Sequence, residues 1–266
     1  SMFVVLGVVS LALLIFFMTR FTNTPDENPR MSKAEREFLR QERATAAHAS
    51  PPDTSVTPVW HFFKNKDLLL NAVGYFSFVY VTFLLLTWTP KYLQDEFHYN
   101  LSSLWYMGMI PWTGACFTVL LGGKLSDWLL RRTGNLKVAR SWLAATCLLL
   151  TTLCFILVSQ AQTVWGVIAL MTVANALNAL PNSVYWAVVI DTAPSNRVGA
   201  YSGMTHFIAN TASFIAPMLT GYLTVRYGYS SMFVAAAVAT ALGMGAMLMV
   251  RPGSRHVAPS PLPAVV

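Results

Sequence analysis

The stretch Leu68–Pro90 reads LLLNAVGYFSFVYVTFLLLTWTP and holds no charged side chain. About 20 consecutive apolar residues are enough for a helix to cross the hydrocarbon core of a bilayer. Because lipid supplies no water to an open strand edge, a spanning run of this kind is expected to be helical. We therefore predict a transmembrane helix over this stretch.

Six more apolar runs have a similar length, and nearly all charged residues lie between them. They are Met2–Thr19, Leu104–Gly123, Ser141–Ser159, Thr163–Ile190, Val198–Val225 and Ser231–Val250. The composition is 55% hydrophobic and 11% charged, whereas soluble domains carry about 25% charged residues. The alternating segments of about ten residues that build outer-membrane barrels are missing from the sequence. The predicted fold class is an all-α membrane protein with about seven transmembrane helices.

The net charge of +7 does not indicate a nucleic-acid partner, because the basic residues follow the predicted topology. Of the 18 lysine and arginine residues, 16 lie on one side of the seven predicted spans, and only Lys91 and Arg226 lie on the other. Cytoplasmic loops carry the excess of Lys and Arg in membrane proteins. We expect a multi-pass protein of the plasma membrane, or of the inner membrane in a bacterium, with a cytoplasmic C-terminus.

The sequence gives no signal for catalysis, a metal or a cofactor. Cys116, Cys147 and Cys154 all lie in apolar runs, without the spacing of metal ligands or of a disulfide framework. The glycine-rich turns do not match the phosphate-binding pattern G-x-x-x-x-G-K-[ST]. We therefore expect no catalytic residue, no metal and no cofactor.

The 47 residues from Arg20 to Lys66 form a connection too long for a tight turn. Ser32, followed by Glu35, predicts a capping box that opens a short charged helix ending at about Arg43. A linker rich in proline and serine follows. The residues from Trp60 to Phe63 then predict an amphipathic segment at the membrane surface, where aromatic rings are favoured.

One helix, a long loop and six closely connected helices are what the second half of a transporter with two parallel halves would show. We expect residues 1–19 to be the last helix of a missing N-terminal bundle and residues 20–66 to be the cytoplasmic inter-bundle loop. Residues 67–251 would form a C-terminal six-helix bundle, and residues 252–266 a cytoplasmic tail. The apolar start at Met2, with no basic residue before it, predicts a chain cut at the exterior edge of a helix.

Between the third and fourth runs stands Gly123-Lys-Leu-Ser-Asp127-Trp-Leu-Leu-Arg131-Arg132-Thr-Gly134, for which we expect a short cytoplasmic turn. The first glycine allows close helix approach, and Asp127 can accept hydrogen bonds from helix N-termini or from arginine. Arg131 and Arg132 would hold the cytoplasmic face, so the group could latch one conformation. The alternative is a positive-inside loop with an incidental aspartate.

This segment resembles the signature G-x-x-x-D-x-x-G-R-R of the major facilitator superfamily, although Leu130 replaces the second glycine. Other segments resemble the anion:cation symporter family, which includes galactonate, glucarate and hexuronate permeases. They are Asn28–Glu35, Gly74–Phe76 with Thr87–Leu93, Trp186–Pro194, and Tyr201–Gly203 through Asn210 and Pro217 to Tyr222. The resemblance implies helices 6–12 of a twelve-helix fold and secondary active transport, by alternating access, of a sugar acid, dicarboxylate or aromatic acid.

The resemblance also implies partners. Transport would be symport coupled to H⁺, with Na⁺ as the alternative, and it would need the lipid bilayer and the missing N-terminal half. The proton-handling carboxylate and the anion-binding arginine of the family resemble first-half features, and no such residue lies within these spans. No nucleic-acid partner is expected.

Polar residues form one face on each of two runs. On the first run Asn175, Asn178 and Asn182 fall at i, i+3 and i+7, and Pro181 is expected to break or kink the helix. On the next run the face consists of Ser202, His206, Asn210 and Ser213. Gly199 and Gly203 would permit close packing there. Because each amide needs a partner in hydrocarbon, the faces should point into the bundle or a watery cavity.

His206 is the only ionisable residue of the Asp, Glu, Lys, Arg and His types well inside any run. Eight residues from Val198 place it roughly 12 Å deep, near the middle of the bilayer, where such transporters bind substrate. Three roles stay open, namely a neutral interhelical hydrogen bond, a substrate contact, and proton coupling.

By resemblance, substrate contacts fall on residues that match Ser183, Tyr185 and Trp186, and on His206, which replaces a family asparagine. A histidine at that place and the bulk of Tyr185 favour a smaller or flatter anion than galactonate. The candidate substrate-binding residues are Ser183, Tyr185, Trp186, His206, Asn210, Asn182, Tyr75 and Tyr80. The candidate gating group is Gly123, Asp127, Arg131 and Arg132.

Two other protein classes stay as alternatives. In a polytopic membrane enzyme, Ser202 and His206 would be a nucleophile and its base, but neither a nucleophile elbow nor a metal-site motif accompanies them. A seven-helix receptor or retinal protein agrees with the helix count alone. The last run holds no lysine that could form a Schiff base.

Overall fold

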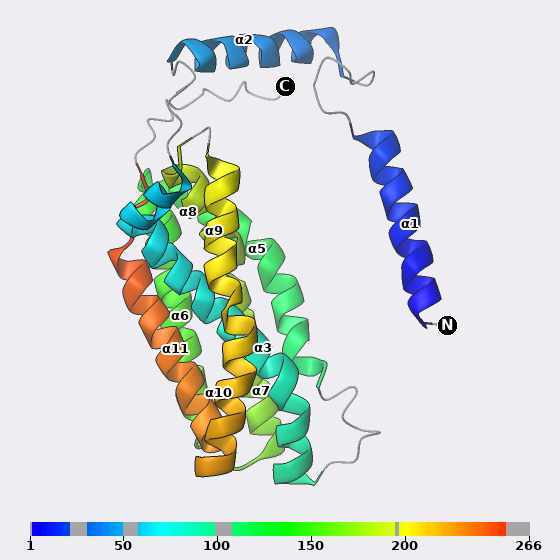
Figure 1. The fold of residues 1–266 in the computed structure, drawn as a ribbon, viewed down its shortest axis with the longest axis vertical. Helices are drawn as coiled ribbons and strands as arrows, with labels where there is room; N and C mark the ends of the chain where they lie inside the picture. The colour runs from blue at the N-terminus through cyan, green and yellow to red at the C-terminus, as the bar shows by residue number, and fades with distance from the viewer. Residues whose placement is uncertain (1, 22–30, 50–57, 99–107, 195–196, 254–266) are drawn as a thin grey trace. The chain divides into compact units, whose positions relative to one another are not determined.

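The computed structural model describes residues 2–21, 31–49, 58–98, 108–194 and 197–253. All regular secondary structure in these ranges is helical, which confirms the all-α class. The chain divides into two units, Ser1–Val56 and Thr57–Val266 (Figure 1). Two predicted segments lie mostly outside the described residues. They are the linker that follows the short charged helix and the C-terminal tail.

The first unit holds two helices, α1 (Met2–Arg20) and α2 (Lys33–Ala49). At the start of α2 the Glu35 backbone N–H donates to Ser32 Oγ at 3.2 Å, as the capping box predicts. The expected end at Arg43 is wrong, because the helix continues to Ala49. The added turns are rich in alanine, the residue with the highest helix propensity.

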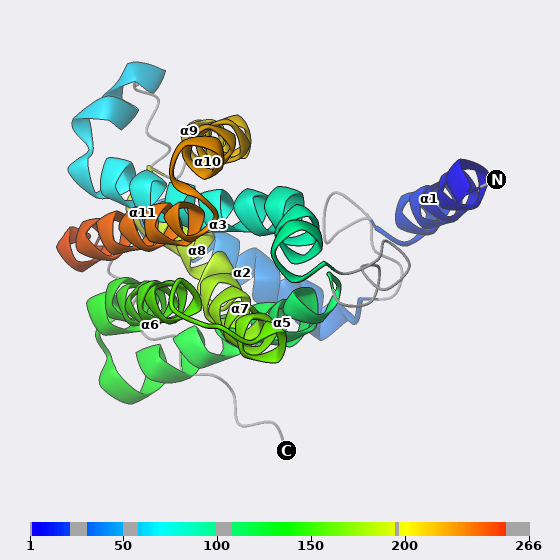
Figure 2. The same ribbon diagram turned by 90° about the horizontal axis from the view of Figure 1, so that it is seen from below.

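The second unit is a bundle of helices (Figures 1 and 2). In chain order it contains η2 (Val59–Lys64, a 3₁₀ helix), α3 (Lys66–Phe97), α5 (Ile110–Thr133), η3 (Lys137–Trp142, a π-helix), α6 (Leu143–Val158), α7 (Val164–Ala179), α8 (Asn182–Thr192), α9 (Val198–Asn210), α10 (Ala212–Tyr227) and α11 (Ser230–Met249). In η2, Phe62 is buried against Tyr201, whereas Trp60 is 75% exposed. The segment is therefore amphipathic, as predicted.

Helix α3 is the centre of this bundle, since it packs against α7, α8, α9, α10 and α11. Two buried asparagines join it to its neighbours. Asn71 Nδ2 donates to the Tyr185 carbonyl oxygen at 3.0 Å, and Asn178 Nδ2 donates to the Phe78 carbonyl oxygen at 3.1 Å. Such bonds hold helices together where no water can replace a missing partner.

Two of the predicted runs are divided in the structure. The run over residues 163–190 breaks into α7 and α8, with Pro181 at the junction, as its missing N–H predicts. The run over residues 198–225 breaks at Thr211, which the sequence analysis did not predict. There the hydroxyl and the backbone N–H of Thr211 both bond to the Ile208 carbonyl oxygen, at 2.7 and 3.2 Å. This bonding tightens the chain into a turn.

Five of the seven predicted spans qualify as membrane-spanning by helix length and hydropathy within the described ranges. They are Phe3–Arg20, Lys66–Phe97, Lys137–Val158, Val164–Thr192 and Ser230–Met249. Of the remaining two runs, one is divided at Thr211, and the described part of the other lies within or just before the 24-residue helix α5. Four charged residues in the second half of α5 lower its mean hydropathy.

The predicted turn at the signature segment is wrong, because α5 remains helical through Asp127 and Arg132 to Thr133. The helix ends at Gly134, which has the left-handed φ of 63° and donates its N–H to the Leu130 carbonyl oxygen at 2.8 Å. Glycine adopts this conformation without steric cost. Leu130 is a better helix former than glycine, so the chain has no reason to leave the helix earlier.

Close helix approach depends on glycines that the sequence analysis did not select. A Cβ atom at Gly122 would overlap the Leu180 carbonyl oxygen, and one at Gly243 would overlap the Ser77 hydroxyl. The expectation for Gly199 and Gly203 is wrong within the described part of the chain, because a Cβ at either would meet nothing within 4 Å. The difference arises because α9 turns these glycines away from its neighbours.

We predict that Gly122→Ala destabilises the bundle, because α5 must move away from the end of α7. Overpacking of this kind costs about 1–3 kcal/mol. The matched control is Gly203→Ala, which adds the same methyl group to a helix with open space. Thermal unfolding of the purified protein should show a lower Tm for Gly122→Ala only, and equal Tm values would contradict the close contact.

Candidate functional site

Three side chains from three helices meet about halfway along the bundle. Tyr75 Oη lies 3.3 Å from His206 Nδ1, and the rings of Trp186 and His206 are 5.5 Å apart. The ring of Tyr75 is also 5.9 Å from that of Trp186. We call Tyr75, Trp186 and His206 the aromatic cluster.

The depth of the cluster follows from helix geometry. Tyr75 is nine residues after the start of α3, and His206 is eight residues after the start of α9, so both lie roughly 12–14 Å from those ends. His206 is exposed, Trp186 is half-buried and Tyr75 is 6% exposed. The cluster therefore presents an imidazole, backed by two aromatic rings, at mid-helix depth on an open side of the bundle.

Tyr185 lies behind the cluster. It is 1% exposed, its ring stacks on that of Tyr75 at 5.2 Å, and it also lies beside Gly74 of α3. Its carbonyl oxygen accepts the hydrogen bond from Asn71. Tyr185 is thus part of the core that holds Tyr75, and it is not on the open face.

No described contact joins the side chains of three other candidates to those of the cluster. Ser183 points toward α5, where its Oγ would lie 3.6 Å from a Cβ at Gly123, and this buried hydroxyl has no hydrogen-bond partner in the described structure. Asn182 is half-buried at the first position of α8. Asn210 donates to the carbonyl oxygen of His206 on its own helix at 2.8 Å, so its amide braces the backbone beneath the imidazole.

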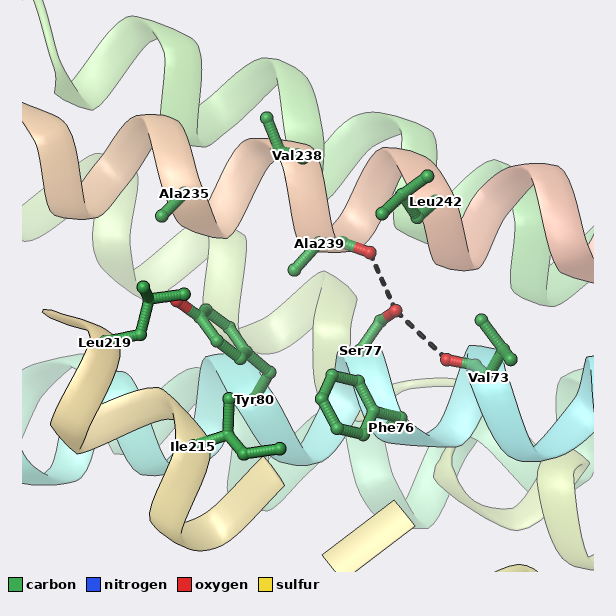
Figure 3. Close-up of a pocket in the computed structure, with 10 residues that line it drawn as sticks. All are labelled: Val73, Phe76, Ser77, Tyr80, Ile215, Leu219, Ala235, Val238, Ala239 and Leu242. Atoms are coloured by element: carbon green, nitrogen blue, oxygen red, sulfur yellow. Dashed lines mark hydrogen bonds between the residues drawn. The ribbon is translucent and has the colours of Figure 1, made fainter. Parts of the chain in front are cut away.

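Tyr80 lies in a different place. Its ring forms part of the wall of a largely apolar pocket of about 390 Å³ between α3, α10 and α11 (Figure 3). Ser77 on the same wall hydrogen-bonds to the carbonyl oxygens of Val73 and Ala239, at 3.1 and 2.7 Å. Five residues separate Tyr80 from Tyr75, which places the two rings on different sides of α3.

The predicted polar face of Asn175, Asn178 and Asn182 has a structural role in α7, which carries the first two of these residues. Asn175 Nδ2 donates to the Pro111 carbonyl oxygen at 3.0 Å, and Asn178 bonds to α3 as described above. Both residues are at most 2% exposed. The prediction that this face points into the bundle is confirmed, and two of its three amides are occupied by helix contacts.

A network of charges lies where α5 and α8 end and η3 begins. Arg140 Nη1 is 3.3 Å from Asp127 Oδ1, and Arg140 Nε is 3.2 Å from Asp191 Oδ2. Arg140 Nη1 also donates to Ser126 Oγ. The side chains of Arg140 and Asp191 are 12% and 22% exposed, against 55% for Asp127. One guanidinium group thus bridges carboxylates from two helices.

The other gating candidates take different positions. Arg131 and Arg132 are exposed, and the Arg132 guanidinium lies 5.3 Å from the centre of the Trp128 ring. Gly123 is half-buried beside Ser183. Sequence reasoning counted Arg140 only as a positive-inside charge and gave Asp191 no role. The available signal was a basic residue in the short segment between the signature motif and the next apolar run.

The family model described as Major Facilitator Superfamily matches residues 1–213 and 133–265 of the chain. These overlapping matches cover nearly the whole sequence. The chain belongs to the major facilitator superfamily. It is therefore part of a multi-pass membrane protein, as the resemblance in the sequence indicates.

Several relatives of this superfamily chain carry the names of transporters. It is 30% identical to a hexuronate transporter of Bacillus subtilis, over 81% of this chain and 52% of that protein. It is 28% identical to a probable sulfoacetate transporter of Cupriavidus necator, over 94% of this chain and 57% of that protein. It is 29% identical to a probable galactarate/D-glucarate transporter of Escherichia coli, over 83% of this chain and 51% of that protein.

The chain spans about half the length of the curated relatives it matches. All of these relatives are named as transporters, which confirms the prediction that the chain does not belong to an enzyme.

We predict unequal contributions from the two ion pairs of this superfamily member. The Arg140–Asp191 pair is largely shielded and should contribute roughly 1.5–3 kcal/mol, as hydrogen bonds between charged groups do. The Arg140–Asp127 pair is more exposed and should contribute at most about 1 kcal/mol.

Double-mutant cycles that combine Arg140→Gln with Asp191→Asn or with Asp127→Asn would measure the two coupling energies by thermal unfolding. The two carboxylates serve as controls for each other, because each mutation removes one charge. Equal coupling energies would show that burial does not distinguish the pairs.

Proposed function

We propose that the chain supplies the C-terminal half of a secondary transporter for small organic anions. The observation that supports this proposal best is the exposed imidazole of His206, held by Tyr75 and Trp186 at mid-helix depth. An ionisable side chain inside a membrane-spanning helix is costly, and such residues usually mark a substrate or ion pathway. The relatives are named for hexuronate, sulfoacetate and galactarate or glucarate, all of which are acid anions.

The chemistry of the aromatic cluster favours a carboxylate beside a flat or compact body. A protonated imidazole can bind a carboxylate with a charge-assisted hydrogen bond. The Trp186 ring supplies an apolar wall, and the hydroxyl of Tyr75 fixes the imidazole through its Nδ1. We therefore propose His206 as the anion contact, with Tyr75 and Trp186 around it.

The remaining candidates have supporting roles in this proposal. Tyr185 positions Tyr75 from behind, and Asn210 braces the backbone at His206. Ser183, which faces α5, could contact substrate only if α8 shifts relative to α5. Asn182 lies one helical turn before Trp186 on α8 and stays a candidate for substrate contact. Tyr80, in the pocket between α3, α10 and α11, is the weakest candidate for substrate contact.

Transport would use alternating access, in which one bundle moves against the other about a shared central site. The N-terminal half and the coupling ion, H⁺ with Na⁺ as the alternative, complete this proposal. The network of Asp127, Arg140 and Asp191 would latch one conformation, with Gly123, Arg131 and Arg132 around it. The protein would lie in the plasma membrane with a cytoplasmic C-terminus.

A change of His206 to asparagine tests the anion contact. If a protonated imidazole binds the anion, affinity of the complete transporter should rise as pH falls. His206→Asn should remove this dependence, weaken binding at low pH by about tenfold and shift preference toward polyhydroxylated acids. Competition binding with sugar acids, dicarboxylates and aromatic acids would measure both effects.

The matched control is His61→Asn, the same substitution at an exposed position in η2 outside the cluster. It should leave the pH profile and the ranking of ligands unchanged. If His206→Asn also leaves both unchanged in a well-folded protein, His206 is only a helix contact. If the complete protein binds none of the three ligand classes, the proposed function fails.

Cysteine labelling tests the orientation. We predict that Asn135→Cys, in the segment after α5, reacts with an impermeant reagent only after the cells are opened, because the basic residues gather on that side. Gln162→Cys, between α6 and α7, should react from outside intact cells. The native cysteines are first replaced by serine. The reverse pattern would show that the orientation is inverted.

A further inference from the structure

A basic cavity lies at one end of the bundle, away from the aromatic cluster. It has a volume of about 460 Å³ and is lined by Lys66, Asp67, Lys137, Leu248, Met249 and Arg251. Lys66 begins α3, Lys137 begins η3, and Arg251 follows the end of α11. The cavity therefore joins the ends of three elements at the level where these helices leave the hydrocarbon.

Positive charge is in excess in this cavity. Three cationic side chains face one carboxylate, and Asp67 Oδ1 already accepts the backbone N–H of Arg251 at 2.7 Å. Within the described ranges, Lys66, Lys137 and Arg251 take part in no ion pair. Among the described residues, the cavity thus holds three cations and a single carboxylate.

An apolar groove between α6 and α11 adjoins the basic cavity at Leu248. The groove has a volume of about 90 Å³ and is lined by Trp142, Ala145, Thr146, Leu149, Met244 and Leu248. Leu248 lines both spaces. Trp142, 55% exposed at the groove, has the position of the tryptophans that anchor proteins at the membrane interface. The two spaces together offer cations beside the headgroup level and an apolar path along the helices.

We propose that the basic cavity and the apolar groove form one binding site for an anionic phospholipid. Basic pockets between transmembrane helices bind anionic lipid headgroups. The phosphate would lie between Lys66, Lys137 and Arg251, and one acyl chain would follow the groove past Leu248 and Trp142. A soluble organic anion would satisfy the cations but would leave the groove empty, so the combination selects a lipid.

Such a lipid would tie together the elements that meet at this end. Ser141 Oγ already donates to the Val250 carbonyl oxygen at 3.0 Å, which links η3 to the end of α11, and Asp67 links α3 to Arg251. A phosphate shared by Lys66, Lys137 and Arg251 would reinforce both links. Arg140 lies in the same π-helical segment as Lys137, so lipid binding would also steady the charge network.

Native mass spectrometry of the complete protein, titrated with phosphatidylglycerol or with phosphatidylcholine, tests this proposal. The wild type should retain phosphatidylglycerol preferentially. Lys66→Gln/Lys137→Gln should weaken its retention by roughly 30-fold, because each lysine near an anionic lipid surface contributes about a factor of five. The matched control is Lys33→Gln/Lys124→Gln, which removes the same two charges at exposed positions outside the cavity.

Lys66→Arg/Lys137→Arg keeps both charges and should retain the lipid, which separates loss of charge from loss of fold. Glycerol phosphate, which has the headgroup chemistry without acyl chains, should compete poorly. If the test pair and the matched control lose lipid retention equally, the effect comes from general surface charge, and the proposed site is overturned. Full displacement of the lipid by glycerol phosphate at similar concentration would overturn the role of the groove.

Discussion

Hydrocarbon satisfies no polar group, and the arrangement of the bundle depends on this constraint. The amide groups of Asn71, Asn175 and Asn178 each donate to a backbone carbonyl oxygen of another helix. A carbonyl oxygen has two lone pairs, so it can accept such a bond in addition to its helical one. In lipid, loss of one of these bonds leaves an amide that nothing else can satisfy. The constraint therefore fixes how α5, α7 and α8 lie relative to one another and to α3.

The break at Pro181 allows α7 and α8 to serve different purposes. The asparagine amides of α7 bond to α5 and α3. The first side chains of α8, in contrast, lie in three different environments. Ser183 faces α5, Tyr185 enters the core beneath Tyr75, and Trp186 reaches His206. A continuous helix would keep the direction of α7 and could not direct these side chains in the same way. The aromatic cluster is thus a consequence of one proline in the middle of a spanning segment.

Features local to the chain could be predicted from the sequence, and features set by distant neighbours could not. Apolar runs, the break at Pro181 and the cap at Ser32 depend on short stretches of sequence. The close contact of Gly122 with Leu180 and the burial of Tyr185 depend on which helix lies alongside. For the site, the family resemblance named both Trp186 and His206 as candidates, and the structure brings their rings together. No spacing rule could show that Arg140 bridges Asp127 and Asp191, since these residues come from three segments.

Helix α8 connects the two regions that the proposed function requires. Asp191, near its end, pairs with Arg140, and the carbonyl oxygen of Tyr185 accepts the bond from Asn71. Trp186 lies between these two attachments, only five residues before Asp191, which is roughly 7.5 Å along a helix. Over so short a distance a helix moves as a rigid body. Release of the Asp191 pair would therefore let the whole of α8 pivot about the Asn71 bond, and the indole of Trp186 would move relative to His206. In the proposed function, the stiffness of this one helix would couple the charge network to the aromatic cluster.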